Sequence, residues 1–413
     1  MPDWPASRGV RSPARRSLLR GAGALALGAG LPACALPMRE APVPRGRSGA
    51  VSVLGLPNER FRPDSPGGFD AFDREITAAL QRQARHLGVS RTADLPTLDL
   101  IAISGGGENG AFGAGLLNGW TAHGGRPVFD LVTGVSTGAL TAPFAFLGSG
   151  WDAKLKAVYT EITPDRVLVR RWFTAALWDD AMADSTPLFR MISEYLDAEM
   201  MAGIAAGYDE GRLLMVASAD IDAQVPVFWN IGAIAKSGHP RALDTVRRIL
   251  LASAAIPGAF PPVLFDVELD GVKHQEMHVD GGAFAQAFLY PAVATRGRRD
   301  AIAQGRRVTP ARAWVIRNGR LDSEWAATDR RTVSIAARAI TTMIGSSGYN
   351  DVMRIYFAAQ RDGVDFNLAF IGSDFTTEYT VPFEQAYMRA LYDYGFERAR
   401  RGFDWTRIPP GAA

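Results

Sequence analysis

Apolar runs that end at glycine or polar residues alternate along the chain with segments of helical periodicity. The runs of strand-like character cover residues 98–104, 129–133, 213–219, 226–229, 277–280, 312–317 and 365–371. Apolar residues recur at helical spacing over 109–120, 139–147, 245–253, 332–360 and 384–401. Strands that alternate with helices predict a three-layer α/β fold, with a mostly parallel sheet and helices on both faces.

Two details of this pattern concern connections. The helical region 332–360 contains Gly-Ser-Ser-Gly at 345–348, and we expect an interruption there. The runs 213–219 and 226–229 are separated by the turn-rich sequence Asp220-Ile221-Asp222-Ala223-Gln224. These two runs are therefore predicted to be strands joined by a short turn.

Residues 1–33 are predicted to be an export signal that is not part of the fold. Arg15-Arg16 gives a charged region with a twin-arginine look, and the apolar run 21–31 is too short to span a bilayer. Cys34, the only cysteine, follows directly. The combination resembles a bacterial lipoprotein signal, which implies cleavage before Cys34 and lipid on the new N-terminus. An ordinary cleaved export signal with a chance cysteine is the alternative.

The rest of the chain divides into three parts. Residues 34–97 are expected to be a tether and N-terminal extension, because prolines and glycines punctuate 37–68 and an amphipathic helix covers 69–87. Residues 98–400 are expected to form one catalytic α/β domain, which is large enough to bury a full core. Residues 401–413 remain as a C-terminal tail.

Composition and charge exclude several classes of function. Without the five arginines and Asp3 of the signal, the chain has a net charge of about −2, so nothing favours a nucleic-acid partner. The absence of further cysteines fits an exported protein without disulfides. No group of His, Cys and Asp has metal-ligand spacing, and we expect neither a metal nor a cofactor. Nothing in the sequence indicates an oligomeric state.

Gly134-Val135-Ser136-Thr137-Gly138 is a G-x-S-x-G segment between a predicted strand and a predicted helix. A serine on such a sharp turn needs small neighbours, because the backbone must fold tightly and leave the hydroxyl exposed. The following helix N-terminus directs partial positive charge at the same point. Ser136 is therefore the candidate nucleophile, and Gly134 and Gly138 support its turn.

Two further glycine-rich segments complete the needs of acyl transfer, which are a nucleophile, a base and a site for oxyanion charge. Gly105, Gly106 and Gly107 follow a strand and open a helix together with Gly110, so their N–H groups are the candidate oxyanion hole. Asp280 is the candidate base. Its neighbours Gly281 and Gly282 permit a close approach to the serine.

In this order the three segments resemble the patatin-like phospholipase family, in which a glycine loop, a G-x-S-x-G serine and an Asp-Gly-Gly aspartate form a Ser–Asp dyad. The likeness covers roughly residues 98–290 and includes the stretch from Ala252 to Pro262. It implies a patatin-like fold and a Ser136 acyl-enzyme, with Asp280 as base if desolvation raises its pKa toward neutrality. The family usually has Arg or Lys where this chain has Asn109.

Two other interpretations of the motifs are weaker. Gly105-x-Gly107-x-x-Gly110 also matches a dinucleotide fingerprint, but Asp130, at the distance expected for a ribose acid, begins a strand instead of ending one. A Ser-His-Asp triad of hydrolase order needs a histidine after the acid. No histidine follows Asp280, and His278 is expected to be structural.

Aromatic pairs at Trp172-Phe173 and Phe228-Trp229, with Trp178, fit the core better than an acyl groove. The sequence thus predicts a serine acyl-ester hydrolase that acts on lipids, of the phospholipase A or lysophospholipase kind. A non-catalytic lipid-binding envelope lipoprotein is the alternative that Asn109 leaves open. The expected partners are a membrane lipid or other acyl ester and, through lipidated Cys34, a membrane surface. The expected location is the bacterial cell envelope, on the periplasmic side of a membrane or in the periplasm.

Overall fold

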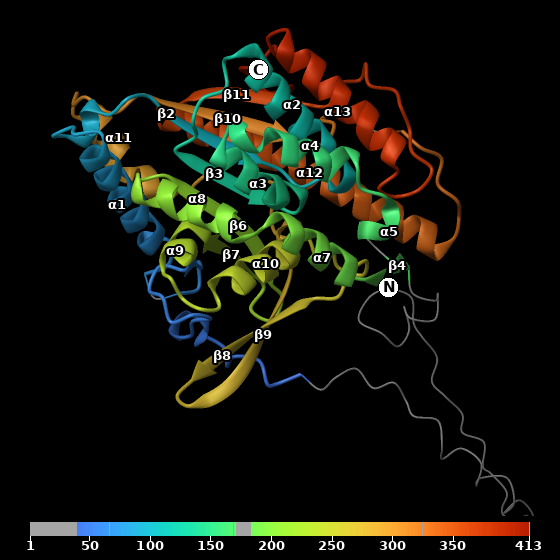
Figure 1. Cartoon of the computed structure of the whole chain (residues 1–413), viewed down its shortest axis with the longest axis horizontal. Helices are drawn as coiled ribbons and strands as arrows, with labels where there is room; N and C mark the ends of the chain where they lie inside the picture. The colour runs from blue at the N-terminus through green and yellow to red at the C-terminus, as the bar shows by residue number, and fades with distance from the viewer. Residues whose placement is uncertain (1–38, 66, 168, 171–182, 324, 413) are drawn as a thin grey trace, which may run out of the picture. The chain divides into compact units, whose positions relative to one another are not determined.

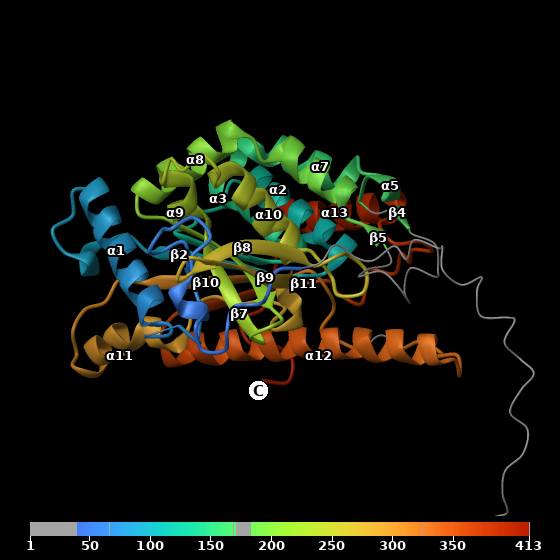
Figure 2. The same ribbon diagram turned by 90° about the horizontal axis from the view of Figure 1, so that it is seen from below.

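The structure is a computed structural model that describes residues 39–412 except 66, 168, 171–182 and 324. The predicted export signal, Cys34, Trp172-Phe173 and Trp178 lie outside the described residues. Within the compact unit Arg39–Ala413, a nine-stranded mixed sheet carries helices on both faces (Figure 1, Figure 2). The predicted three-layer α/β architecture is confirmed.

Five neighbouring strands of the sheet are parallel, in the order β11-β10-β2-β3-β6, and β11 is the outer strand. They are β2 (Leu98–Ile103), β3 (Leu131–Val135), β6 (Leu213–Asp220), β10 (Ala311–Arg317) and β11 (Asp365–Phe370). Helices cover both faces, and every residue of β3 and β6 is buried, which explains why these strands are continuous apolar runs. The strand order reverses between β2 and β10, so the loops after these two strands meet at one point of the sheet edge.

An antiparallel region extends the sheet beyond β6. It consists of β7 (Val225–Asn230), β1 (Arg60–Phe61), β9 (Val272–Asp280) and β8 (Val263–Leu269). The predicted turn joins β6 to β7. The β8–β9 hairpin was predicted only at its last four residues, because the outward positions of both strands are polar, as at Asp266, Glu268 and Lys273.

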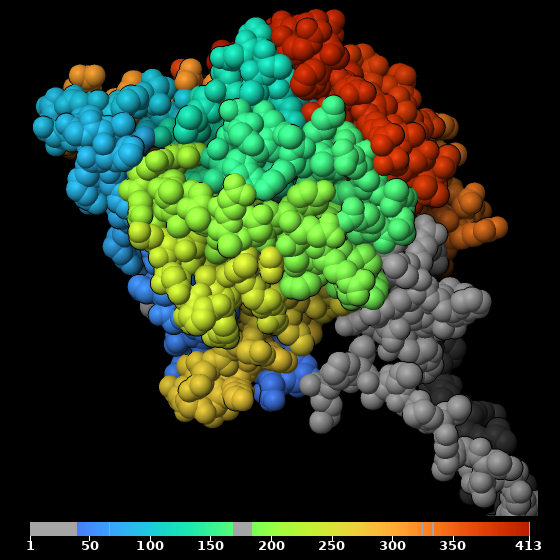
Figure 3. Space-filling view, viewed as in Figure 1, coloured from blue at the N-terminus to red at the C-terminus, as the bar shows by residue number. Residues whose placement is uncertain are grey.

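Most helices cover one face of the sheet, and in the space-filling view α13 lies along α2 and α4 at the border of this face (Figure 3). They are α2 (Gly110–His123), α3 (Thr137–Leu147), α4 (Asp152–Thr160), α7 (Thr186–Tyr195), α8 (Ala198–Asp209), α9 (Ile231–Lys236), α10 (Ala242–Ser253) and α13 (Gln385–Arg400). The remaining short elements are α5 (Pro164–Val167), β4 (Val169–Arg170), β5 (Ala183–Asp184), η1 (Ser48–Ala50), η2 (Thr92–Asp94), η3 (Gly107–Asn109), η4 (Ser149–Trp151), η5 (Gly281–Ala283) and η6 (Ala292–Thr295).

On the other face lie α11 (Arg296–Ala303) and α12 (Thr332–Arg361), while α1 (Asp70–His86) lies beside the end of the sheet at which β2, β3 and β6 begin. The predicted interruption of α12 is wrong, because this helix is continuous over 30 residues. Gly348 does not break it. A Cβ there would lie 2.5 Å from Cζ of Arg317, so this glycine makes room for a guanidinium at the point where the helix crosses β10. Within the described part of the chain, no helix is both long and apolar enough to cross a membrane.

Both ends of the described chain are packed against the sheet. Val51, Val53 and Leu54 are buried, and Glu59 accepts the N–H groups of Val53 and Leu54 at 2.6 and 2.9 Å. The segment from residue 39 to 68 is therefore irregular, as its prolines and glycines suggested, but it is not a free tether.

The C-terminal tail is attached in the same way. Thr406 and Leu368 of β11 exchange two backbone hydrogen bonds of 3.0 and 2.9 Å. The indole of Trp405 packs on Trp120 and Trp314, at ring distances of 4.8 and 4.7 Å. The tail as described thus belongs to the same folded unit as the sheet.

Candidate active site

Ser136 lies on the turn between β3 and α3, with φ 55° and ψ −126°. A side-chain-bearing residue rarely adopts such a conformation, which costs on the order of 1–3 kcal/mol and is concentrated at functional sites. Close packing allows the turn. A Cβ on Gly138 would lie 2.1 Å from the carbonyl oxygen of Ile103, and one on Gly134 would lie 2.5 Å from that of Gly138. The structure thus places Ser136 on the strand-to-helix turn that its sequence predicts.

Asp280 ends β9 and is brought to Ser136 by the sheet. Its carboxyl is hydrogen-bonded to the side chain of Ser136 and accepts the N–H of Gly282 at 2.7 Å. Gly281 beside it packs against β6, where a Cβ would lie 2.6 Å from the carbonyl oxygen of Ala217. Only 5% of Asp280 is exposed, and burial raises its pKa to about 6 although both hydrogen bonds act in the opposite direction.

The glycine loop follows β2 and passes directly beside the serine. A Cβ on Gly105 would lie 3.2 Å from Cβ of Ser136. Gly106 has φ 158°, and a Cβ there would lie 2.1 Å from the carbonyl oxygen of Asn318, so only glycine fits. Gly107, with φ 57°, opens η3.

Not all of the four predicted oxyanion donors are available. The N–H of Gly105 donates to the carbonyl oxygen of Gln286 at 2.9 Å, and the N–H of Gly110 bonds back to Gly107. The N–H groups of Gly106 and Gly107 have no acceptor among the described residues, nor has that of Thr137, the first residue of α3. Of the four candidates, Gly106 and Gly107 therefore keep an N–H without an acceptor among the described residues, and Thr137, which the sequence analysis did not name, offers a third.

Asn318, which follows β10, holds the start of the glycine loop. Its N–H donates to Oγ of Ser104 at 2.8 Å and its Nδ2 to the carbonyl oxygen of Ser104 at 2.9 Å. Its Oδ1 accepts the N–H of Gly113 at 3.1 Å. The sequence carries no signal for this role, because an asparagine after a strand is common and the contact spans more than 200 residues.

Ser253 and Ala255 hold the two ends of the dyad. Oγ of Ser253 accepts the N–H of Ser136 at 3.0 Å and donates to the carbonyl oxygen of Ala217 at 2.6 Å. The carbonyl oxygen of Ala255 accepts the N–H of Asp280 at 2.9 Å. Both belong to the stretch from Ala252 to Pro262 that resembles the family. The sequence analysis identified this stretch but gave no structural role for Ser253 or Ala255.

Gln286 connects the glycine loop to the loop after Asp280. Its carbonyl oxygen accepts the N–H of Gly105, and its Nε2 donates to the carbonyl oxygen of Gly282 at 3.0 Å. Its own N–H donates to Asp351 of α12 at 2.6 Å. Asn109 connects the end of the glycine loop to α13, because its Oδ1 accepts a hydrogen bond from the hydroxyl of Tyr387 at 2.6 Å. The site is therefore braced by a helix on each face of the sheet.

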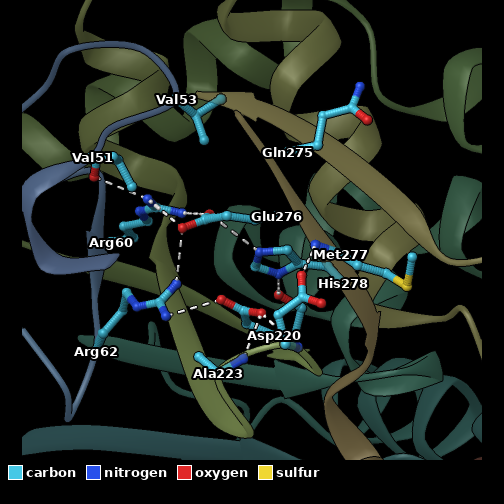
Figure 4. Close-up of polar contacts among 12 residues, drawn as sticks. Val51, Val53, Arg60, Arg62, Asp220, Ala223, Gln275, Glu276, Met277 and His278 are labelled. Carbon is cyan, nitrogen blue, oxygen red and sulfur yellow. Dashed lines mark hydrogen bonds and ion pairs between the residues drawn. The ribbon is translucent and has the colours of Figure 1, made fainter. Parts of the chain in front are cut away.

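His278 belongs to a different group of side chains (Figure 4). It is fully buried, its Nδ1 lies 2.8 Å from Oγ of Ser218, and its Nε2 lies 3.5 Å from Oε2 of Glu276. Burial lowers its pKa, so the ring is neutral at physiological pH. The polar contacts of the His278 ring go to Ser218 and Glu276 and not to Ser136 or Asp280, which agrees with the structural role expected for it.

Asp220, Glu276 and His278 have ligand atoms within 4.8 Å of one another, and among the described residues they are the one such group with metal-ligating side chains. Arg62 donates to Asp220 at 2.9 Å and to Glu276 at 3.2 Å, and Arg60 also donates to Glu276 (Figure 4). Two guanidinium groups thus stand where a divalent cation would have to bind. The group fits a buried ion-pair network and does not fit a metal site.

A cavity of about 360 Å³ lies at the other end of the sheet, lined by the first residues of β2, β3, β6 and β10. Asp130 lines it, and burial raises the pKa of Asp130 to about 6. Asp130 and the glycine loop therefore lie at opposite ends of the parallel strands, which excludes a dinucleotide held by both. Phe228 and Trp229 are buried core residues, as expected.

Comparison with known proteins bears on the same region of the chain. Residues 101–293 match the family model described as patatin-like phospholipase. No curated protein sequence matches the chain. Among solved structures, the crystal structure of VipD from Legionella pneumophila resembles it with a TM-score of 0.35 and 11% sequence identity, over 76% of this chain and 69% of that chain. A likeness at this level says nothing about the substrate.

Proposed function

Because residues 101–293 match the patatin-like phospholipase family, we propose that the chain hydrolyses acyl esters of lipids through Ser136 and Asp280. One observation carries the proposal. The strained Ser136 is hydrogen-bonded to a buried carboxyl whose pKa is raised to about 6. A general base is most effective when its pKa lies near the working pH, so Asp280 can accept the serine proton without a histidine.

The proposed reaction has two halves. Oγ of Ser136 attacks the ester carbonyl carbon while its proton passes to Asp280, and the N–H groups of Gly106 and Gly107 stabilise the oxyanion. Asp280 then returns the proton to the departing alcohol, which leaves an acyl group on Ser136. In the second half Asp280 takes a proton from water while the water oxygen attacks the acyl carbon. Asp280 then returns this proton to Oγ of Ser136 as the bond from Oγ to the acyl carbon breaks and the fatty acid leaves.

The base and the oxyanion donors are each expected to make a large contribution to the rate of hydrolysis. A positioned general base contributes typically about 10²–10⁴ in rate. Each oxyanion donor contributes about 10²–10³. The N-terminus of α3 adds partial positive charge beside the same oxygen.

A fluorophosphonate label tests the nucleophile directly. We expect wild type to be labelled and Ser136→Ala to remain unlabelled, while Ser237→Ala, at the residue that follows α9, is labelled like wild type. A panel of phospholipids, lysophospholipids and short-chain esters then defines the substrate. Wild-type protein that binds lipid but takes no label and hydrolyses no ester would instead be the non-catalytic lipoprotein.

We further propose that the chain is exported and carries lipid on Cys34, from the signal-like pattern of residues 1–34. One acyl chain gives marginal membrane binding, whereas two or more give stable anchoring. Cys34→Ser should release the protein from the membrane fraction and leave hydrolysis of a soluble ester unchanged. Mass spectrometry of the mature N-terminus decides the matter, because an unmodified N-terminus at another residue excludes the anchor.

A further inference from the structure

The two halves of α12 are packed in different ways. In the C-terminal half, Val352, Ile355 and Ala359 are buried beneath the sheet. In residues 332–347, which we call the projecting half, no residue with a described side chain is buried. Figure 2 shows α12 running beneath the sheet, with this half continuing past the ends of β10 and β11.

The projecting half is amphipathic, and its apolar face points outward. Ile335, Ile340, Met343 and Ile344 are exposed by 53%, 56%, 70% and 39%, so four large apolar side chains within ten residues are open to solvent. At about 100° per residue they share one side of the helix. Three residues are partly covered, namely Ser334 and Arg338 on the other side of the helix and Ser347, which adjoins the buried Gly348. A surface helix normally has the reverse arrangement, and exposed apolar patches of this kind mark interaction sites.

The projecting half starts beside the candidate active site. Gly348 lies against Arg317, whose guanidinium donates to the carbonyl oxygen of Gly105 at 3.2 Å. Asp351, three residues further on, binds the N–H of Gln286, which in turn holds Gly105. The sixteen residues before Gly348 extend about 24 Å from this point at 1.5 Å per residue.

Other exposed apolar side chains surround the same site. Phe284, four residues after Asp280, is 50% exposed. Tyr379 and Val381 are 46% and 45% exposed, and the hydroxyl of Tyr379 is hydrogen-bonded to Glu108 in η3. The projecting half and this rim therefore present apolar surface around the serine.

The charge of the segment indicates which surface fits it. Residues 330–350 contain three arginines and no aspartate or glutamate, and Arg330 and Arg331 at the start of the helix are exposed. Apolar residues on one face with basic residues beside them are typical of helices that lie in the plane of a lipid interface with anionic headgroups. The helix is not apolar enough to cross the bilayer.

We propose that the projecting half of α12 lies in the interfacial layer of an anionic phospholipid surface and so brings Ser136 to its lipid substrate. Ile340 and Met343 enter the acyl boundary, and Arg330 and Arg331 contact headgroups. The purpose of this contact rests on the proposed function. The contact itself can be measured without hydrolysis.

A fluorophore on the helix reports the contact in the full chain. Cys34→Ser removes the only cysteine, so that Met343→Cys and Thr341→Cys can each be labelled alone with an environment-sensitive dye. These positions are two residues, or about 160°, apart around one helix. We expect vesicles of phosphatidylcholine with phosphatidylglycerol to shift emission to the blue at residue 343, with little change at 341. Vesicles of phosphatidylcholine alone should give a weaker shift.

Several outcomes would overturn the proposal. Equal shifts at both positions, or no shift at 343 in protein that sediments with the vesicles, would show that the apolar face does not enter the lipid. A blue shift without lipid that grows with protein concentration would show that a second copy of the chain covers this face.

Matched charge insertions give a second test. Ile340→Asp/Met343→Asp should lower the partition onto phosphatidylglycerol vesicles about 10-fold or more, because two large apolar side chains are lost from the interface. Thr341→Asp/Gly345→Asp adds the same charge to the opposite face, where the Cβ of residue 345 meets open space, and should have a much smaller effect.

Both double variants should hydrolyse a soluble ester within about 2-fold of wild type, since neither touches the dyad. Ser136→Ala should bind vesicles like wild type. Loss of hydrolysis in every form with intact vesicle binding would refute the proposed function alone. Equal binding of the two double variants would refute the lipid contact alone.

Discussion

Asp280 and Glu276 lie four residues apart on the same face of β9, and both are buried, yet their surroundings have opposite effects on their protons. Asp280 meets the hydroxyl of Ser136 and the N–H of Gly282, and burial raises its pKa to about 6. Burial alone would also raise the pKa of Glu276, but the charge of Arg60 and the contact with His278 outweigh it and hold this pKa well below its usual range.

The difference shows that burial does not by itself make a carboxylate basic. A guanidinium beside a carboxylate stabilises the negative charge and leaves a poor proton acceptor. A carboxylate that meets only neutral donors keeps its affinity for a proton. On one strand, therefore, the chain holds a carboxylate suited to proton transfer and another suited to binding the N-terminal segment through Arg60 and Arg62.

The largest expected effect is that of Asp280→Asn. Removing the base should lower kcat/KM for an ester by about 10³-fold or more in a folded protein. Ser136→Ala should do the same, and the double variant should be little worse than either single one because the two side chains act as a unit. Steady-state kinetics and circular dichroism check this. Activity that survives Asp280→Asn but disappears in folded His278→Gln would reverse the assignment.

Glu276→Gln should have the opposite profile. It leaves Arg60 and Arg62 with less countercharge in a buried network, so the free energy of unfolding should fall by about 3 kcal/mol. The folded fraction should keep most of its activity. Urea denaturation measures the loss, and Glu268→Gln on the exposed side of β8 is the matched control, with a change of at most about 0.5 kcal/mol. A stable Glu276→Gln protein without activity would show that this network acts in catalysis.

Asp280 and Glu276 are expected to change the stability of the protein with pH in opposite directions. The raised pKa of Asp280 means that the native state holds its proton up to about pH 6 while the unfolded chain releases it near 4, so this group lowers stability as pH rises between these values. Glu276, with its lowered pKa, stabilises the fold above its unfolded pKa near 4.5 and loses this effect as pH falls.

Asp280→Asn should therefore be more stable than wild type at pH 8, by on the order of 2 kcal/mol, and similar to it at pH 4. Denaturation at the two pH values measures the difference. If Asp280→Asn is more stable than wild type by the same free energy at pH 4 and pH 8, packing and not the ionisation of Asp280 causes the difference.

The smallest expected effects concern the pH profile of activity. Log kcat/KM should rise with unit slope up to about pH 6 and then level off, because Asp280 must be ionised to accept the serine proton. His278→Gln should leave the pH dependence below pH 6 unchanged and lower kcat/KM by no more than about 3-fold, since the hydrogen bond of His278 Nδ1 goes to Ser218 and not to the dyad. A shift of the pH at which kcat/KM levels off in His278→Gln would show that His278 is coupled to Asp280.

The positions of the candidate site residues in the fold were predictable because their geometry is local. A serine on a strand-to-helix turn needs glycine on both sides, and the loops of Gly106 and Gly281 need glycine for close approach, so short segments of sequence carry the signal. The parallel strands were predictable for a similar reason, since burial on both faces produces continuous apolar runs.

What could not be predicted depends on residues far apart in the chain. Asn318, Gln286 and Asp351 are common residue types in ordinary contexts, and only the sheet topology brings them to the glycine loop. The same topology occupies the N–H of Gly105, which the motif alone offers to an oxyanion. Gly348 suggested a helix break because its sequence neighbours do not show the guanidinium that it accommodates.

The pairing of Thr406 with Leu368 has a consequence for the behaviour of the whole molecule. β11 is an outer strand, and an outer strand displays unpaired N–H and C=O groups that can recruit a strand of another chain. The two hydrogen bonds from Thr406 occupy part of that row, and the packing of Trp405 holds them in place. The segment around Thr406 thus covers part of the outer edge of β11, so loss of this pairing should leave more of that edge open to a strand of another chain.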